Sequence, residues 1–475
     1  MVFSSMEFLF RFLPIFLVAY FLTKKAYRNI TLLIGSLIFY AYGEPVYVLL
    51  MIGSILVNHF IARRIQRFHS IEKASGIDCS FERKAWLVTA LVLDFGLLFL
   101  FKYVNFFIGV ANNIAGRQLI KEVALTLPLG ISFYTFQITS YIIDVYRKKI
   151  VVLKSSICFA TYVCMFPQLI AGPIINYPEI KPEMQGIRKA NLKQIEWGVT
   201  EFIVGLAYKV LLANKIASLW NDVQMAGAYG INTATAWLGS WGYSMQILFD
   251  FMGYSLMAMG LGAIMGFRFP VNFKDPYCAV SMTDFWRRWH ITLGRWFREY
   301  VYIPMGGNRK GFVRMVWAMF VVWVLTGLWH GADWNFLIWG LFLFAVLFVE
   351  KLFLGKVLDK VKILGHLYML FMIPLSWTIF NINKLDQLKV YLKRMFGMHI
   401  DGSVVIDGMA RFKDLLGTYW WLLLICVVCC TPLPYKLICR FYRNYICKII
   451  LLVLFWYSVY QIALGGNNPF LYFRF

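Results

Sequence analysis

Residues 314–354 read RMVWAMFVVWVLTGLWHGADWNFLIWGLFLFAVLFVEKLFL, and this stretch decides the fold class of the chain. It holds two apolar runs, 314–332 and 333–354, and between Arg314 and Glu350 its only charged side chain is Asp333. A helix needs about 20 apolar residues to cross the hydrocarbon core of a bilayer. The stretch therefore predicts two consecutive membrane-spanning helices joined by a short polar turn.

Similar apolar runs cover most of the remaining sequence. We expect membrane helices at 6–23, 29–43, 45–62, 86–101, 103–116, 123–146, 156–175, 195–218, 233–266, 361–380, 418–431 and 445–464. Several runs are too short to cross alone, and prolines at 166–173 predict a break that only surrounding protein or a cavity can shield. We therefore predict an all-α, polytopic integral membrane protein of about 11–12 transmembrane helices, with re-entrant and interfacial helices besides. The loop 382–417 is expected to carry short surface helices.

The composition agrees with a chain embedded in lipid. Of the 475 residues, 60% are hydrophobic and 15% are charged, whereas soluble domains carry about 25% charged residues. The mean hydropathy is +0.65. We therefore expect one membrane-embedded domain over 1–475. No metal site is expected, because Cys426, Cys429 and Cys430 lie within an apolar run, where cysteine behaves as a small hydrophobic residue.

The formal net charge of +23 is attributed to topology and not to nucleic-acid binding. The basic residues fall in short loops, where Lys and Arg mark the cytoplasmic side and contact anionic lipid. The loop at 43–45 has none, and the basic clusters are Lys24, Lys25 and Arg28; Arg63, Arg64 and Arg67; and Arg147, Lys148 and Lys149. We expect a multi-pass protein of the cell membrane with a retained first helix and an extracytoplasmic N-terminus.

The turn between the two helices of 314–354 holds the first candidate site. His330 lies between two apolar runs, and a neutral imidazole can act as a general base at physiological pH. Asp333 is three residues further on, and on a helix these two positions share a face, so Asp333 is a candidate to orient the ring. The alternative is a structural histidine that bonds to the backbone at a helix break.

A charged and aromatic segment, 281–310, is the second candidate. Ser281 followed by Asp284 resembles a capping box and predicts a helix start. Tryptophans recur at helical spacing and arginines fill the other faces, which is typical of an amphipathic, partly inserted segment. It is either an interfacial anchor or the wall of a cytoplasmic opening that attracts a phosphate-bearing donor. The residues concerned are Arg287, Arg288, His290, Arg298 and Asn308, the last in a tight turn.

Two further apolar runs carry polar side chains. Gln246 and Asp250 are four residues apart in 233–266 and should face the same neighbour, and an intramembrane Asp is expected to pair with an Arg or His. Ser132 and Gln137 lie in 123–146. Hydrogen bonds between helices are the ordinary explanation for such residues, and the wall of a polar tunnel is the alternative.

Five motifs in these regions resemble the membrane-bound O-acyltransferase family and, within it, the alginate O-acetyltransferase-like branch. They are PLGISFYTFQ at 128–137, FPQLIAGPI at 166–174, FWRRWH at 285–290, YIPMGGNR at 302–309 and TGLWHG at 326–331. The likeness covers a motif core of about 128–340 and reappears in NPFLYF at 468–473. The resemblance implies a helical ring around a central tunnel, with the donor entering from the cytoplasm and the acceptor from outside.

The resemblance also assigns roles to single residues. It implies that His330 is the catalytic histidine and that His290 is a second family histidine that lines or shapes the same tunnel. The chain departs from the branch at Met252 and Leu256, where polar residues are usual, and at Asn176, near which an Arg is usual. These changes fall where acceptor or donor contacts are expected.

The expected reaction is O-acyl transfer from a cytoplasmic thioester, in first place acetyl-CoA, to hydroxyls of an extracellular polysaccharide, as in alginate-type O-acetylation. No bound cofactor is expected, because the thioester is a co-substrate. The resemblance implies a separate extracytoplasmic, hydrolase-like partner. One alternative is D-alanyl transfer to teichoic acid from an acyl carrier protein. The others are a non-enzymatic transporter or flippase, which would show inverted repeats, and a structural scaffold.

Overall fold

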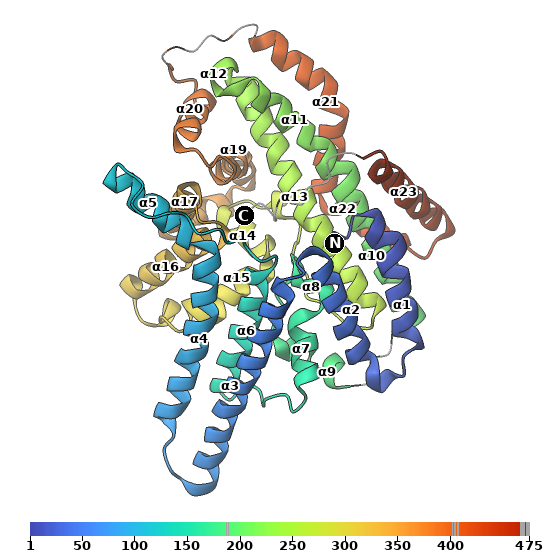
Figure 1. Ribbon diagram of the computed structural model, residues 1–475. Helices are drawn as coiled ribbons and strands as arrows, with labels where there is room; N and C mark the ends of the chain where they lie inside the picture. Colours follow the sequence, from blue (N-terminus) through green and yellow to red (C-terminus); the bar gives the residue numbers. More distant parts are fainter. Residues whose placement is uncertain are drawn as a thin grey trace. The chain divides into compact units, whose positions relative to one another are not determined.

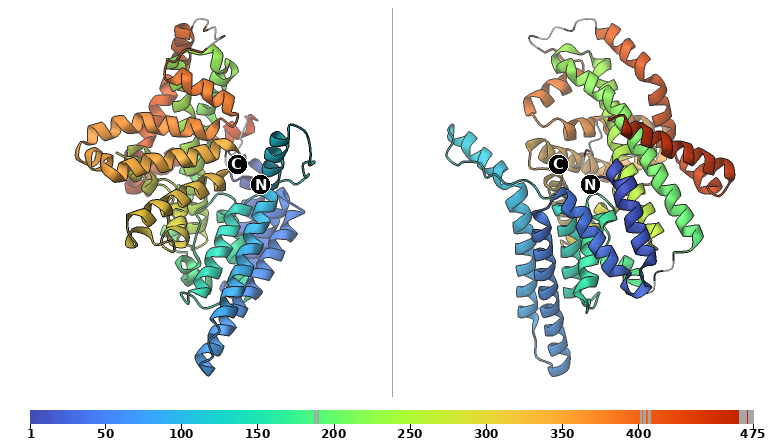
Figure 2. Two further views of the ribbon diagram at one scale, coloured as in Figure 1. Left: turned by 90° about the vertical axis from the view of Figure 1, so that its left-hand side faces the viewer. Right: turned by 45° about the vertical axis from the view of Figure 1, so that its right-hand side comes forward.

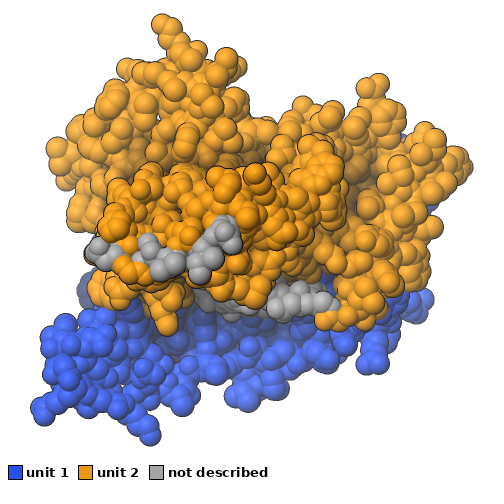
Figure 3. All heavy atoms as spheres, turned by 90° about the horizontal axis from the view of Figure 1, so that it is seen from above, with its two compact units in different colours: residues 1–199, 258–270 blue, residues 200–257, 271–475 orange. Residues whose placement is uncertain are grey.

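The computed structural model describes all residues of the chain except 187, 189, 401, 403–404, 406–407, 466–470 and 472–475. The described residues form helices and loops with no strand among them, which confirms the all-α prediction (Figure 1). They group into two compact units, residues 1–199 with 258–270 (unit 1) and residues 200–257 with 271–475 (unit 2), coloured separately in Figure 3. The motif NPFLYF lies outside the described residues apart from Leu471.

Nine helices of the described part are long and apolar enough to cross a membrane, which confirms a polytopic membrane protein. They are Tyr47–Ser75, Ser80–Lys102, Leu192–Met225, Thr233–Ile264, Phe312–His330, Trp334–Lys360, Lys362–Asn381, Gly408–Cys430 and Tyr445–Ala463. Two shorter apolar helices, Phe8–Leu22 and Val104–Ala115, add to these nine.

Unit 1 begins with two helical hairpins. In the second, α3 and α4 run side by side in every view and reach beyond the other helices of the unit (Figures 1 and 2). The elements of the unit are η1 (Phe8–Phe12), α1 (Leu13–Leu22), η2 (Lys25–Tyr27), α2 (Arg28–Gly43), α3 (Tyr47–Ser75), α4 (Ser80–Lys102), α5 (Val104–Ala115), α6 (Ile131–Tyr146), α7 (Ser156–Cys164), α8 (Phe166–Leu169) and α9 (Tyr177–Gln185). Helices α10 (Leu192–Ala207) and α13 (Thr233–Ile264) contribute residues to both units.

Unit 2 combines long apolar helices with a group of short ones. Its remaining elements are η3 (Tyr208–Ala213), α11 (Asn214–Met225), α12 (Gly227–Gly230), η4 (Pro276–Cys278), α14 (Met282–Arg288), α15 (Ile291–Phe297), η5 (Arg298–Tyr302), η6 (Gly307–Arg309), α16 (Phe312–His330), α17 (Trp334–Val349), η7 (Glu350–Leu354), α18 (Gly355–Lys360), α19 (Lys362–Asn381), α20 (Leu385–Met395), α21 (Gly408–Cys430), α22 (Pro432–Phe441) and α23 (Tyr445–Ala463). Within 382–417 the short helix α20 agrees with the prediction, whereas α21, which begins at Gly408, is a long apolar helix.

The bounds of several predicted runs differ from those of the observed helices, and three are instructive. The run 123–146 becomes helical only at Ile131, because Pro128 and Gly130 turn the chain there, and a Cβ on Gly130 would lie 2.6 Å from the Leu169 carbonyl oxygen. The run 156–175 ends as a helix at Cys164, so the predicted break is confirmed. The run 45–62 continues to Ser75, because the Arg- and Lys-rich residues after it favour a helix as strongly as apolar ones do.

Candidate active site

The turn between α14 and α15 places His290 in unit 2. The side chain of Ser281 accepts a hydrogen bond from the backbone N–H of Asp284 at 3.1 Å, so the predicted helix start is confirmed. The short helix α14 ends at Arg288, and His290 adopts a left-handed conformation with φ 45° and ψ 51° before α15 begins. A non-glycine residue in this region costs about 1–3 kcal/mol and is held there by its surroundings, often at functional sites.

Asn272 supplies the surroundings that hold His290. Its Oδ1 lies 3.1 Å from His290 Nδ1, and it accepts hydrogen bonds from the Thr292 backbone N–H at 3.3 Å and the Thr292 hydroxyl at 2.9 Å. The backbone carbonyl of Asn272 also accepts from the Ile291 N–H at 3.0 Å. The His290 ring is 1% exposed. This burial lowers its pKa to about 3, so the imidazole is neutral.

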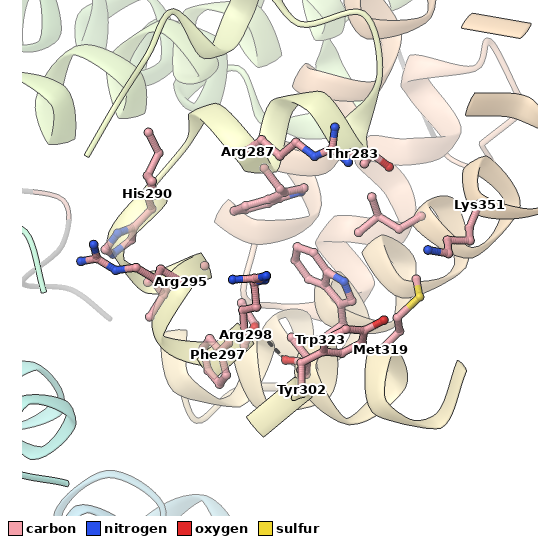
Figure 4. Close-up of a pocket in the computed structure, with 17 residues that line it drawn as sticks. Thr283, Arg287, His290, Arg295, Phe297, Arg298, Tyr302, Met319, Trp323 and Lys351 are labelled. Atoms are coloured by element: carbon pink, nitrogen blue, oxygen red, sulfur yellow. Dashed lines mark hydrogen bonds between the residues drawn. The ribbon is translucent and has the colours of Figure 1, made fainter. Parts of the chain in front are cut away.

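A cavity of about 510 Å³ opens beside His290, entirely within unit 2 (Figure 4). A cavity of this size falls in the range of small-molecule sites. It is lined by Thr283, Trp286, Arg287, His290, Ile291, Leu293, Gly294, Arg295, Phe297, Arg298, Tyr302, Met319, Val322, Trp323, Thr326, Leu347 and Lys351. Apart from His290, which precedes α15, these residues come from α14, α15, η5, α16, α17 and η7.

Four basic side chains line this cavity together with apolar walls. They are Arg287, Arg295, Arg298 and Lys351, and Figure 4 shows Arg298 and Lys351 reaching toward it from different sides. Arg287, Arg298 and Lys351 are exposed residues, whereas His290 is buried. The cavity therefore has exposed basic side chains, and a buried imidazole borders it. Such an arrangement suits a ligand that carries phosphate at one end and an uncharged reacting group at the other.

Two predicted residues of the same segment do not line this cavity. Arg288 donates from Nε to Asp284 Oδ1 at 2.9 Å, an ion pair within α14. Asn308 is exposed, and its Oδ1 accepts a hydrogen bond at 2.7 Å from the hydroxyl of Tyr302, which does line the cavity. Arg288 therefore contacts α14, and Asn308 contacts the cavity wall through Tyr302.

His330 is the last residue of α16 and is packed among aromatic rings. Its ring centroid lies 4.9 Å from Trp329, 5.1 Å from Trp339 and 5.1 Å from Phe380, with interplanar angles of 77–89°. His330 is 5% exposed and is not among the residues that line the cavity. Thr326, one helical turn earlier on α16, does line it. The two histidines thus belong to the same part of unit 2, joined through Trp329, whose ring is 6.0 Å from that of His290.

The helical argument for Asp333 is wrong. Helix α16 ends at His330, Gly331 and Asp333 are extended, and Asp333 precedes α17 as its N-cap. The positions therefore do not share a helix face. The Asp333 carboxylate is exposed and accepts a hydrogen bond from Asn383 at 3.4 Å.

Asp250 has a buried partner, although of another type than predicted. It pairs with Lys209 of η3, not with an Arg or His, and both side chains are at most 3% exposed. The backbone N–H of Leu471 donates to the second carboxylate oxygen of Asp250 at 2.8 Å. Gln246, one turn away on α13, is 8% exposed. Neither Gln246 nor Asp250 lines the cavity.

Ser132 and Gln137 lie on α6, in unit 1. Gln137 is fully buried, and neither its amide oxygen nor its amide nitrogen has a hydrogen-bond partner among the described residues. Of the three departures from the branch, Leu256 packs where α10 and α13 cross at Gly205. Asn176 precedes α9, and its backbone N–H donates to the Glu179 carboxylate at 3.0 Å.

Two residues that support the site, Glu350 and Asn272, were not predicted from the sequence. Glu350 is 4% exposed, and its carboxylate accepts hydrogen bonds from the Met282 and Thr283 backbone N–H groups at 2.7 and 2.8 Å and from the Thr283 hydroxyl at 2.6 Å. Its place inside an apolar run was the available hint, because charges in such runs are costly. Asn272 lies in a loop, where an amide is unremarkable.

Comparisons with known proteins agree with these motifs. The sequence model described as MBOAT, membrane-bound O-acyltransferase family, matches residues 147–358. The chain is 35% identical over 504 residues to the probable alginate O-acetylase AlgI of Pseudomonas putida, with all of both chains covered. It is 33% identical over 434 residues to the peptidoglycan O-acetyltransferase of Helicobacter pylori, covering 84% of this chain and 80% of the relative. The teichoic acid D-alanyltransferase of Bacillus subtilis is 31% identical over 227 residues, 45% of this chain and 56% of the relative.

Proposed function

The chain belongs to the membrane-bound O-acyltransferase family and is an O-acyltransferase, and we propose that it moves an acetyl group from a cytoplasmic thioester to hydroxyls of an extracellular polysaccharide. The relatives covered over most of their length carry the names alginate O-acetylase and peptidoglycan O-acetyltransferase, which supports an acetyl group and a carbohydrate acceptor. The teichoic acid D-alanyltransferase matches less than half of this chain. It therefore supports D-alanyl transfer from a carrier protein less strongly than the other relatives support acetyl transfer.

The cavity beside His290 is the observation that carries the proposal. Its outer part holds Arg287, Arg298 and Lys351, which match the phosphates of coenzyme A or of a carrier-bound phosphopantetheine. Its inner part holds Leu293, Thr326 and Trp323, which exclude water from the thioester and so protect it from hydrolysis. A purely structural scaffold would not need a cavity with basic side chains that can bind a phosphate-bearing donor.

The proposed chemistry assigns the proton transfer to His330, which lies one helical turn after Thr326 of the cavity wall. The oxygen of the acceptor hydroxyl attacks the thioester carbonyl carbon, the new C–O bond forms, and the C–S bond breaks. His330 accepts the hydroxyl proton and returns it to the departing sulfur, so that the products are an ester and a thiol. His290 shapes the wall of the cavity beside the reacting groups. The acceptor is a sugar hydroxyl or a hydroxyl of the extracytoplasmic partner that we expect to complete transfer.

Acyl transfer in reconstituted membranes tests this proposal. Labelled acetyl-CoA is supplied on the cytoplasmic face to wild type, His330→Ala and His290→Ala, with His366→Ala as a matched control because His366 is exposed on α19. We expect ester formation by wild type and the control, and a loss of about 10²–10⁴-fold for His330→Ala, the usual contribution of a general base. Equal transfer by folded His330→Ala would contradict the assignment. Transfer only from a carrier-protein thioester would select the D-alanyl alternative.

A further inference from the structure

Helix α22 is a short segment that joins two helices long enough to cross the membrane, α21 and α23 (Figure 1). It covers the ten residues Pro432–Phe441, with only Thr431 between it and α21, and α23 begins at Tyr445. Ten helical residues span about 15 Å, which is about half the thickness of the hydrocarbon core. Because α22 cannot cross the bilayer, the end of α21 and the start of α23 lie at the same membrane face, and α22 lies along that face.

One side of α22 presents an apolar stripe away from the protein. None of the residues of α22 is buried, and Leu433, Leu437 and Phe441 are 57, 48 and 45% exposed. These three residues follow one another at intervals of four, so they lie on one side of the helix. The other side contacts the protein, since the Tyr435 hydroxyl donates a hydrogen bond to Glu201 Oε1 of α10 at 3.1 Å.

Basic side chains border the apolar stripe. Lys436 and Arg440 are both exposed and lie four residues apart, and the sequence from 432 to 448 contains no Asp or Glu. Lys436 interacts with the carboxylate of Asp275, but Lys274 and Arg288 interact with the same carboxylate. Positive charge is therefore in excess beside the stripe.

Helix α20 is a short helix of similar length whose apolar side is covered by the protein itself. Its apolar residues Leu388, Tyr391 and Met395 are buried. The Tyr391 hydroxyl donates a hydrogen bond to the Ala236 carbonyl at 2.9 Å, and the Met395 carbonyl accepts one from Trp237 Nε1–H at 2.8 Å. The exposed stripe of α22 thus differs from the packed stripe of α20 and requires a partner outside the chain.

We propose that α22 lies in the interface of the cytoplasmic leaflet and binds anionic phospholipid, with its apolar stripe among the acyl chains and Lys436 and Arg440 at the lipid phosphates. A surface helix with an apolar and a basic side binds anionic membranes through both sides. Lys and Arg near helix ends are retained in the cytoplasm, and the cytoplasmic leaflet carries negative charge. No residue of α22 lines the cavity beside His290, so this surface is separate from the proposed donor site.

Titration of the purified full chain with phosphatidylglycerol in an uncharged detergent tests the proposal. The melting temperature is followed, and each variant without added lipid serves as its own baseline. Phosphatidylcholine with the same acyl chains is the neutral lipid, and glycerol phosphate is the headgroup without chains. We expect phosphatidylglycerol to raise the melting temperature of wild type more than either. A basic residue near an anionic surface contributes about fivefold in affinity, so the double variant Lys436→Gln, Arg440→Gln should bind phosphatidylglycerol about tenfold or more weakly.

Two further variants separate the site on α22 from a general response to charge. Lys384→Gln with Lys389→Gln removes two exposed lysines at the start of α20, and this control should bind phosphatidylglycerol like wild type. Leu437→Gln leaves the charge unchanged but interrupts the stripe, so it should weaken binding. Equal stabilisation of wild type by phosphatidylcholine or by glycerol phosphate overturns the proposal, as does unchanged binding in the Lys436 and Arg440 variant. Equal weakening in the α20 control would assign the effect to net charge and would contradict a site on α22.

Discussion

The surroundings of the two histidines differ, and the difference suits two roles. The His330 ring meets Trp329, Trp339 and Phe380 nearly edge to face, and Trp339 is itself held by a hydrogen bond to the Ser376 hydroxyl at 2.9 Å. A ring enclosed in this way has one orientation, as a base that must meet its proton within hydrogen-bond reach requires. His290 is instead oriented by polar groups. Sequence motifs predicted both residues, but only the structure gives their environments.

Substitutions of Arg298 and Arg288 distinguish an effect on donor binding from an effect on helix structure. Arg298→Gln should raise the KM for the donor about tenfold or more, because a hydrogen bond to a charged group contributes about 1.5–3 kcal/mol. The effect should weaken at high salt, since exposed charges are screened. Arg288→Gln removes the same charge, but Arg288 pairs with Asp284 and does not line the cavity, so its KM should change little. Steady-state kinetics at two salt concentrations compare them, and equal effects would remove Arg298 from the donor site.

At the scale of the elements, the cavity depends on irregular helices. The π-helical turns η5 and η7 carry Arg298, Tyr302 and Lys351, all of which line it. Such turns often occur at functional sites. A sequence read with the ordinary period of 3.6 residues cannot show where an extra residue enters a turn. It likewise could not show that α16 ends at His330, which is why the helical argument for Asp333 failed.

Glu350 on η7 fixes the start of α14 and thereby two cavity residues, Thr283 and Arg287. Glu350→Gln would leave at least one of the Met282 and Thr283 N–H groups facing an amide NH₂. Losing a helix cap costs about 0.5–2 kcal/mol, so we expect a lower melting temperature in detergent and a higher donor KM. Asp359→Asn, an exposed carboxylate on α18, is the control and should melt like wild type. An unchanged melting temperature for Glu350→Gln would show that α14 is held in another way.

For the whole molecule, hydropathy predicted the fold class well. It did not predict which side chains pair with one another. Runs such as 233–266 and 445–464 match α13 and α23 within a few residues, because the need to satisfy backbone groups in lipid leaves few alternatives to a helix. The partner of Asp250 lies 41 positions away on a π-helical turn, and nothing local marks Lys209 as that partner. Which side chains pair between two helices depends on how the helices pack. The residue type at a single position does not show this.

The orientation of the chain is a property of the whole molecule that can be tested directly. The clusters at 24–28 and 63–67 both lie in unit 1, and the second lies within the α3–α4 hairpin. Lys and Arg near helix ends are retained in the cytoplasm, so we propose that the hairpin tip at 76–79 is cytoplasmic and the N-terminus is outside. The test uses cells whose cytoplasmic membrane is intact and whose outer envelope admits protease. A protease site placed before Met1 should then be cut by added protease. A site inserted at 76–79 should be cut only after the cells are lysed. The reverse pattern would place the basic clusters outside, and the donor would then have to be supplied from the other face.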